Sequence, residues 1–516
     1  MVHHFLIVAF PARGHINPAL QFAKRLIDLG AHVTFSTSLQ MHRHFSKKLT
    51  VPGLNYAPIS DADFKSNPDS NFPLYLSEFK LHGSEFISNI ILSNAKEGGH
   101  PFTCVAYTLI TSWVAEVARE FHIPSALLWV QPATVFDIFY YQFHGYSDYI
   151  YDKTKGKEFS SSRSIELPGL PLLLAPNDLP SYLVASASST NWSSLFIPLF
   201  EEHFRVLDNE TNPLVLVNTF DALESKALRA VDKINVISIG PLVPFDTSYG
   251  GDISKSSDDY IEWLDSKPES SVVYVSFGTT SVLSKIQKEE LARALLDSGH
   301  PFLWVITEKK EKGEEEKEKK EELSCIEELK KNGKIVKWCS QLEVLSRPSL
   351  GCFLTHCGWN STLECLVSGL PVVAFPQHVD QKTNAKLIED IWKIGVRIDH
   401  VVNNEEVVKG EEIKKGLDIV LGNGEKGEEL RRNAKKWKGL AKEAVKEGGS
   451  SDKNLRSFLD DTGGQSMTFH ALFKNGHAHA RRNFGGYCVG MGRMGKNVKS
   501  IKYFDANLTT SNIFYN

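Results

Sequence analysis

The sequence predicts an α/β fold in which two doubly wound parallel sheets face each other across a cleft. Its 516 residues are too many for one compact core. Continuous apolar strands alternate with amphipathic helices, and this alternation stops in a polar stretch and then restarts. We therefore expect an N-terminal domain over residues 1–243, a linker over 244–257 and a C-terminal domain over 258–446.

The N-terminal domain opens with a strand–turn–helix–strand unit. Residues 5–10 form a continuous apolar strand, and Asn17 with Pro18 suit the N-cap and the first position of a helix. Apolar residues then recur with helical spacing until the next strand at 31–35. In such a βαβ unit, ligands bind in the loop after the first strand, which here is residues 11–16.

Further elements continue the alternation. A helix is expected to begin at Ser284, with Gln287 completing a capping box, and another covers 362–368. A last helix over 447–461 is expected to pack back on the N-terminal domain. The remaining expected elements are strands at 103–107, 125–129, 213–219, 235–239, 271–277, 302–306, 350–355 and 371–375, and a helix at 113–121.

Composition excludes several classes of protein. Lys and Arg number 58 against 62 Asp and Glu, so there is no basic excess for binding nucleic acid. No apolar run approaches the ~20 residues of a membrane span, and the apolar N-terminus is too short for a signal peptide. The seven cysteines are scattered, without a CxxC pair, which favours a reducing compartment. We expect a cytoplasmic monomer.

Two segments have unusual composition. Residues 308–322 are almost all Glu and Lys, which is typical of a solvated loop. Residues 462–516 are rich in Gly and basic residues, and we expect a poorly ordered tail. A GxGxxG match at 490–495 lies in this tail without the strand and helix that a dinucleotide site requires, so chance explains it.

The most informative segment is 338–381. A buried strand at 350–355 ends in a glycine-containing turn and a helix N-terminus, which together favour an anion. His356, Asn360 and Ser361 add side-chain donors there, so the expected ligand is a phosphate or diphosphate.

Other residues of this segment suit the rest of a nucleotide sugar. Trp338 can stack on a base, and Glu364 can accept hydrogen bonds from both hydroxyls of a ribose. Asp380 and Gln381 suit the hydroxyls of a sugar. Taken singly, the tryptophans of this segment would more often be core residues than ligand contacts.

The segment resembles the signature box of the plant secondary-product UDP-glycosyltransferases, glycosyltransferase family 1. It starts with Trp-Cys-Ser-Gln, continues through His-Cys-Gly-Trp-Asn-Ser-Thr-Leu-Glu and ends in Asp-Gln, without a gap. The resemblance covers about residues 3–461. It implies a GT-B fold of two Rossmann-like domains, with a UDP-sugar on the C-terminal domain, a small-molecule aglycone on the N-terminal domain, and no metal or other cofactor.

The resemblance also implies residue roles. Trp338 corresponds to the uracil-stacking residue, and Gln341 and Glu364 to the ribose contacts. The terminal Gln381 is usual in members that use glucose, so UDP-glucose is the expected donor. The full implied set of UDP-sugar contacts is Thr279, Trp338, Cys339, Gln341, His356, Gly358, Trp359, Asn360, Ser361, Glu364, Asp380 and Gln381.

His15 resembles the catalytic base of the family. It follows the first strand at a helix N-terminus, where the positive pole disfavours the imidazolium and helps the ring to accept a proton. Many relatives hold an Asp that orients this histidine, but here that position is Thr108. Threonine can hydrogen-bond His15 without supplying a charge, so we expect an acceptor that loses its proton easily, such as an acidic phenol or a carboxylic acid.

Aromatic residues predict where the acceptor binds. They cluster between Trp129 and Tyr149, and together they would line an apolar slot. The stretch 127–138 looks most like the branch with anthocyanin 5-O-, flavonoid 7-O- and crocetin or hormone-ester glucosyltransferases. His378-Val379 departs from the Trp-Thr of many relatives. The expected acceptor pocket comprises Phe10, Trp129, Phe136, Tyr140 and His378.

Transfer of β-glucose to a hydroxyl or carboxyl group, with inversion, is the function that these residues favour. Two alternatives remain at this point. A degenerate relative could bind a nucleotide sugar without catalysis, and a GT-B epimerase would convert UDP-sugar with no acceptor present.

Overall fold

The computed structural model describes residues 3–46, 51–68, 70–96, 99–155, 164–184, 191–244, 259–279, 281–306, 323–398 and 407–473. Three expectations fall outside the described residues: the linker beyond Pro244, the charged segment 308–322, and the tail beyond Phe473 with its GxGxxG match.

The N-terminal half is a parallel seven-stranded sheet covered by helices. Its strand order is β3-β2-β1-β4-β5-β6-β7, and every neighbouring pair is parallel. In chain order its elements are β1 (His4–Val8), α1 (Arg13–Asp28), β2 (His32–Ser36), α2 (Leu39–Ser46), β3 (Leu54–Tyr56), α3 (Phe72–Asn94), β4 (Cys104–Thr108), α4 (Trp113–Glu120), β5 (Ser125–Trp129), α5 (Ala133–Phe143), α6 (Ser147–Thr154), the 3₁₀ turns η1 (Pro176–Asp178) and η2 (Ser181–Leu183), α7 (Asn191–Asp208), β6 (Leu214–Val217), α8 (Asp221–Glu224), η4 (Ala227–Arg229) and β7 (Asn235–Ser238).

The C-terminal half repeats this architecture. Its six parallel strands have the order β10-β9-β8-β11-β12-β13. Its elements are α9 (Asp259–Asp265), β8 (Val272–Ser276), α10 (Lys285–Ser298), β9 (Phe302–Val305), α12 (Ile326–Asn332), β10 (Gly333–Val336), α13 (Gln341–Leu345), β11 (Leu350–Thr355), α14 (Trp359–Ser368), β12 (Val372–Ala374), α15 (Gln381–Lys386), the π-helical turn η5 (Leu387–Ile391), β13 (Gly395–Arg397), α16 (Gly410–Leu421), α17 (Glu425–Val445) and α18 (Ser450–Phe473).

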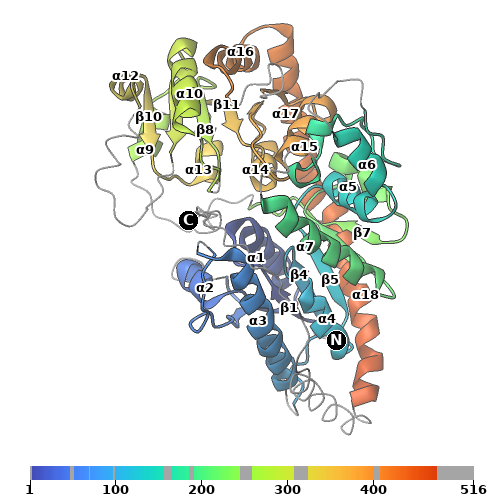
Figure 1. Cartoon of the computed structure of the whole chain (residues 1–516). Coiled ribbons are helices and arrows are strands. Elements are labelled where there is room, and N and C mark those ends of the chain that lie inside the picture. The colour runs from blue at the N-terminus through green and yellow to red at the C-terminus, as the bar shows by residue number, and fades with distance from the viewer. Residues whose placement is uncertain are drawn as a thin grey trace, which may run out of the picture.

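Each sheet has one point at which the strand order reverses. In the first sheet it lies between β1 and β4, and in the second between β8 and β11. Ligands of doubly wound sheets bind beyond the carboxyl ends of the strands at such points. The two halves lie one above the other, with α14 on the side of the C-terminal half that faces the N-terminal half (Figure 1).

The apolar pattern located most strands correctly. Strands β5 and β11 have the bounds that the sequence predicts, and the ends of the other expected strands differ by at most two residues. The strands that the pattern missed, β3, β10 and β13, each lie at the edge of a sheet. Edge strands are short and only partly buried here, so their apolar signal is weak.

The N-terminal ends of α1 and α10 differ from the expectation, in the start of α1 and in the capping box of α10. Helix α1 begins at Arg13 after the N-cap Ala12, so Asn17 is not the cap and Pro18 lies inside the helix. Ser284 does cap α10 by accepting from the backbone N–H of Gln287. The side chain of Gln287 does not complete the capping box, because it exchanges two hydrogen bonds with the backbone of Val408.

Helix α18 connects the end of the chain to its beginning. It runs along the N-terminal half (Figure 1), where the Phe458 ring packs against those of Phe5 and Phe22, with centroids 5.6 and 6.5 Å apart. The Oγ of Ser451 donates to the carbonyl of Gly240 (2.6 Å). The helix extends to Phe473, beyond the expected end at residue 461.

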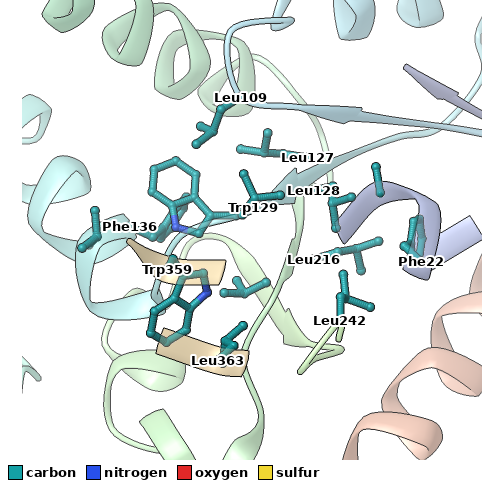
Figure 2. Packing of buried hydrophobic residues seen from close by; sticks show 14 of the residues in the cluster. Phe22, Leu109, Leu127, Leu128, Trp129, Phe136, Leu216, Leu242, Trp359 and Leu363 are labelled. Carbon is teal, nitrogen blue, oxygen red and sulfur yellow. The ribbon is translucent and has the colours of Figure 1, made fainter. Parts of the chain in front are cut away.

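The apolar core continues from one half into the other. Figure 2 shows Trp359 and Leu363 of α14 close to Trp129, Phe136 and Leu216 of the N-terminal half. These five residues belong to one buried cluster. Within the described ranges, no helix combines the length and the apolarity that crossing a membrane requires.

Replacing Phe458 with alanine tests the contact of α18. Phe458 is 1% exposed, so Phe458→Ala should lower the free energy of unfolding by about 3 kcal/mol through lost burial and a cavity. Urea unfolding measures this change. Ser457→Ala, an exposed change on the same helix, should be nearly neutral. Equal stability of the two variants would mean that α18 contributes little to the core.

Candidate active site

The two reversal points meet at a contact that Pro18 makes possible. Because proline lacks an N–H, it cannot bond the carbonyl four residues earlier, which is that of Gly14. The Nδ2 of Asn360, in the first turn of α14, donates to this carbonyl (3.2 Å). The loop after β1 and the turn after β11 are therefore joined directly, with His15 beside the junction.

His15 lies in the first turn of α1 in an apolar environment. Its ring is 5.4 Å from that of Phe10, and its buried Nδ1 has no hydrogen-bond partner among the described residues. Burial, with a smaller contribution from the nearby His203, lowers the pKa of His15 to about 3. The ring is therefore neutral at physiological pH and able to accept a proton.

Thr108 does not act as the hydrogen-bond partner of His15. Its Oγ1 accepts from the backbone N–H of Phe10 (2.9 Å), and its side chain is fully buried at the end of β4. Thr108 thus joins β4 to the strand end that precedes His15. The expected orienting role is wrong, and His15 has no carboxylate in the place where many relatives carry one.

His203 of α7 is a buried residue near this site that the sequence analysis missed. Its Nε2 accepts from the backbone N–H of Ile110 (2.8 Å), and its ring lies parallel to that of Tyr107. Ile110 has a φ of 72°, which is costly for a β-branched residue. His203 therefore holds the loop after β4 in place. Nothing in the sequence around it signalled this role.

The turn after β11 has the expected features of an anion site. His356 is 7% exposed, and its Nδ1 has no hydrogen-bond partner among the described residues. The N-cap of α14 is Gly358, which has no side chain to cap the first N–H groups of the helix, so they can bind an anion. Thr279 is exposed in the turn after the neighbouring strand β8.

Two glycines leave room beside the imidazole of His356. A Cβ on Gly278 would lie 2.8 Å from its Nε2, and a Cβ on Gly358 would lie 2.6 Å from the same atom. Burial lowers the pKa of His356 to about 3, so this ring is also neutral. A neutral imidazole can donate one hydrogen bond to a phosphate oxygen without carrying a full charge.

The expected ribose contacts lie together. The Nε2 of Gln341 donates to Glu364 (2.6 Å) and to Ser361 (2.9 Å). The Oε1 of Gln341 accepts from the hydroxyl of Tyr274, which also contacts the Sγ of Cys339 (3.3 Å). Cys339 is buried beside the Tyr274 hydroxyl, whereas Trp338, which follows β10, is half-buried.

The expected hexose contacts lie at the start of α15. The Oε1 of Gln381 accepts from the backbone N–H groups of Gln377 and His378, which closes the turn. Asp380 is 6% exposed and accepts from the Nδ2 of Asn384 (2.8 Å). Burial raises the pKa of Asp380 to about 6.

The side chain of Trp359 lies in the core between the two halves. It is 3% exposed, its Nε1 donates to the carbonyl of Asn218 (2.8 Å), and its ring packs near Trp392. Figure 2 shows it within the core. The expected contact of Trp359 with the UDP-sugar stays a prediction, and its buried indole, with the N–H bonded, packs at the interface between the two halves.

Most of the expected acceptor pocket is core instead. Trp129 and Phe136 are fully buried and pack edge to face (Figure 2). Tyr140 stacks on His144, at 4.0 Å between centroids. Phe10 is 1% exposed and packs beside His15, so it borders the site without lining an open slot. Only His378 is partly exposed. Aromatic residues at helical spacing therefore indicated a buried core here more reliably than they indicated an acceptor pocket.

The comparison with known proteins agrees with this geometry. Residues 241–425 match the family model described as UDP-glucoronosyl and UDP-glucosyl transferase. The phloretin 4'-O-glucosyltransferase of Malus domestica is 57% identical over 89% of this chain and 97% of its own length. This chain belongs to that family. It is therefore a glycosyltransferase enzyme, as the signature box indicated.

Two further comparisons concern another glucosyltransferase sequence and a solved structure. The chloroplastic crocetin glucosyltransferase of Gardenia jasminoides is 52% identical over 89% of this chain and 97% of its own length. The crystal structure of Os79 from O. sativa in complex with UDP superposes with a TM-score of 0.74 at 32% identity, covering 89% of this chain and all of that one. The expected GT-B fold is confirmed. Within the described residues of the glycosyltransferase, no cluster of three or more His, Cys, Asp or Glu is arranged to hold a metal ion.

Replacing Gly358 with alanine tests the space beside His356. The new Cβ would force the ring to move, so Gly358→Ala should weaken UDP binding about tenfold or more. Isothermal titration calorimetry measures this dissociation constant. Gly439→Ala, at an exposed helical position with open space around it, is the matched control and should bind UDP normally. Unchanged binding in Gly358→Ala would place the diphosphate elsewhere.

Because the pKa of Asp380 is raised, we expect the free energy of unfolding to depend on pH. Its folded pKa of about 6 exceeds the ordinary 3.8, so its contribution to stability is present below pH 4 and is lost as the pH rises through 6. Asp380→Asn should therefore be more stable than the wild type by about 3 kcal/mol above pH 7, and this advantage should shrink towards pH 4.

Urea unfolding at pH 4, 6 and 8 measures this difference. Asp297→Asn, at an exposed position on α10, should show no comparable trend. A difference between Asp380→Asn and the wild type that stays constant with pH would contradict the assigned burial of the ionised carboxylate.

Proposed function

We propose that this chain transfers glucose from UDP-glucose, with inversion, to a hydroxyl or carboxyl group of a plant small molecule. The observation that carries the proposal is the junction of the neutral His15 with the N-terminus of α14, through the bond from Asn360 to Gly14. A proton acceptor on one half thus lies next to an anion site on the other.

The proposed reaction assigns one task to each side of this junction. His15 takes the proton of the acceptor as its oxygen attacks the anomeric carbon of the hexose. The bond between that carbon and the UDP oxygen breaks, and the electron pair leaves with UDP. The free N–H groups at the start of α14 and the imidazole of His356 stabilise the charge that develops on the diphosphate. Attack opposite to the leaving UDP gives the β-glucoside.

The surroundings of His15 favour acidic acceptors. Once protonated, the ring would be a cation in an apolar pocket, and Thr108 supplies no charge to balance it. A phenol of low pKa or a carboxylic acid places less demand on this base than an alkyl alcohol does. The relatives named for phloretin and for crocetin support acceptors of these two classes.

The compartment and the oligomeric state are part of the proposal. The six cysteines in the described ranges are free, which supports a reducing compartment such as the cytoplasm. Both sides of the proposed site come from a single chain, which supports activity as a monomer.

An acceptor panel tests the function. The protein is incubated with UDP-glucose or UDP-galactose and with a carboxylic acid, an acidic phenol or an alkyl alcohol, and products are identified by mass. We expect glucosides, with kcat/KM highest for the acid or the phenol. Best activity on the alkyl alcohol would contradict the preference that we infer from the lack of a balancing charge beside His15. Conversion of UDP-sugar without an acceptor would indicate an epimerase, and binding without turnover a non-catalytic relative.

His15→Ala tests the base on the same panel. Loss of a general base should lower kcat by about 10²- to 10⁴-fold on the alkyl alcohol and by less on the carboxylic acid, which is already ionised. His300→Ala, at the opposite end of the strands just before β9, is the control and should retain activity. Undiminished turnover of the alkyl alcohol by His15→Ala would exclude His15 as the base.

A further inference from the structure

A segment of the N-terminal half reaches over to the turn that holds the hexose contacts. The segment is residues 175–184, which include η1 and η2, and the turn is residues 378–381. The backbone N–H of Ser181 donates to the carbonyl of Val379 (2.8 Å), and the backbone N–H of Val379 donates to the Oγ of Ser181 (2.8 Å). One serine therefore satisfies both backbone polar groups of Val379.

Val379 needs this support because its backbone is strained. Its φ of 61° lies in the left-handed region, which a β-branched residue adopts at a cost of about 1–3 kcal/mol. Such a conformation persists only where neighbouring contacts impose it. The two hydrogen bonds between Val379 and Ser181 are contacts of this kind. The residues that follow directly are Asp380 and Gln381, so the backbone at Val379 sets where both side chains begin.

The same segment is also bonded to α15 and β13. The buried carboxylate of Asp178 accepts from Arg397 (2.6 Å) and lies 3.5 Å from the Nζ of Lys386. The backbone carbonyl of Asp178 accepts from the Oγ1 of Thr383 (2.6 Å). A buried charge pair of this geometry is costly to break, so the segment is fixed relative to α15. Ser181 is thus presented to Val379 from a rigid position.

The side chain of Tyr182 completes the contact on the side of the N-terminal half. Its ring stacks on that of Phe196 in α7, with centroids 4.9 Å apart. The segment is therefore fixed on the C-terminal half by Asp178 and on the N-terminal half by Tyr182. The expected ribose and diphosphate contacts lie on other elements: Gln341 in α13, Glu364 in α14 and His356 directly after β11.

We propose that Ser181 is a positioning residue of the donor site, which imposes the conformation of the turn 378–381 and thereby controls recognition of the hexose but not of the uridine diphosphate. This inference rests on the proposed function, because it takes UDP-glucose as the donor. It assigns a role in donor recognition to the half of the chain that does not hold the nucleotide.

Ser181→Ala in the full-length chain separates the two parts of the donor. The variant loses the acceptor of the partly buried Val379 N–H, and the loss of this bond at a strained residue should shift the turn. We expect the dissociation constant of UDP, measured by calorimetry, to change less than about twofold. The KM for UDP-glucose should rise about tenfold, and the preference for UDP-glucose over UDP-galactose should fall.

Two control variants separate positioning from general destabilisation. Ser181→Thr keeps the hydroxyl and should restore the KM and the preference. Ser266→Ala removes a serine hydroxyl that bonds only a nearby backbone carbonyl, away from the site, and should leave both unchanged. Thermal unfolding of all three variants shows that they are folded.

Each result decides between the proposals. An unchanged KM and an unchanged preference in folded Ser181→Ala overturn the inference while the proposed function stands. An equal loss of affinity for UDP and for UDP-glucose also overturns it, because Ser181 would then only help to hold the two halves together. A wild-type chain that binds UDP but transfers no glucose to any acceptor overturns the proposed function, and the inference with it.

Discussion

The first turn of α14 is held against the N-terminal half by two consecutive side chains, and the arrangement of the site depends on this attachment. Trp359 donates to the carbonyl of Asn218, and Asn360 donates to the carbonyl of Gly14. The helix end that can bind an anion is therefore fixed relative to the loop that carries His15. The second bond exists because Pro18 leaves the Gly14 carbonyl without its usual helical partner.

Burial, more than pairing of charges, sets the electrostatics of the site. Burial lowers the pKa of His15 and of His356, so both rings are neutral, and it raises the pKa of Asp380. A site of this kind holds few fixed charges in the absence of substrate. The incoming diphosphate would then meet oriented N–H groups in a region of low polarity, where each hydrogen bond is stronger than it is in water.

The sequence predicted those features that depend on local pattern. Continuous apolar runs located the central strands, and the spacing of the signature box brought Gln341, Ser361 and Glu364 together. It failed where a tertiary contact decides. Asn17 looks like a helix cap, yet the helix begins before it, and the aromatic residues near Trp129 fill the core. The pairing of Ser181 with Val379 joins distant polar residues, and no periodicity could have revealed it.

The return of α18 to the start of the chain has a consequence for biosynthesis. Phe458 packs on Phe5 of β1, so β1 lacks one of its apolar neighbours until the chain has been translated as far as α18. Nascent domains generally fold as units from the N-terminus. Here the N-terminal half emerges with Phe5 and Phe22 not yet covered by Phe458, and a chaperone that shields apolar patches could bind them during that interval.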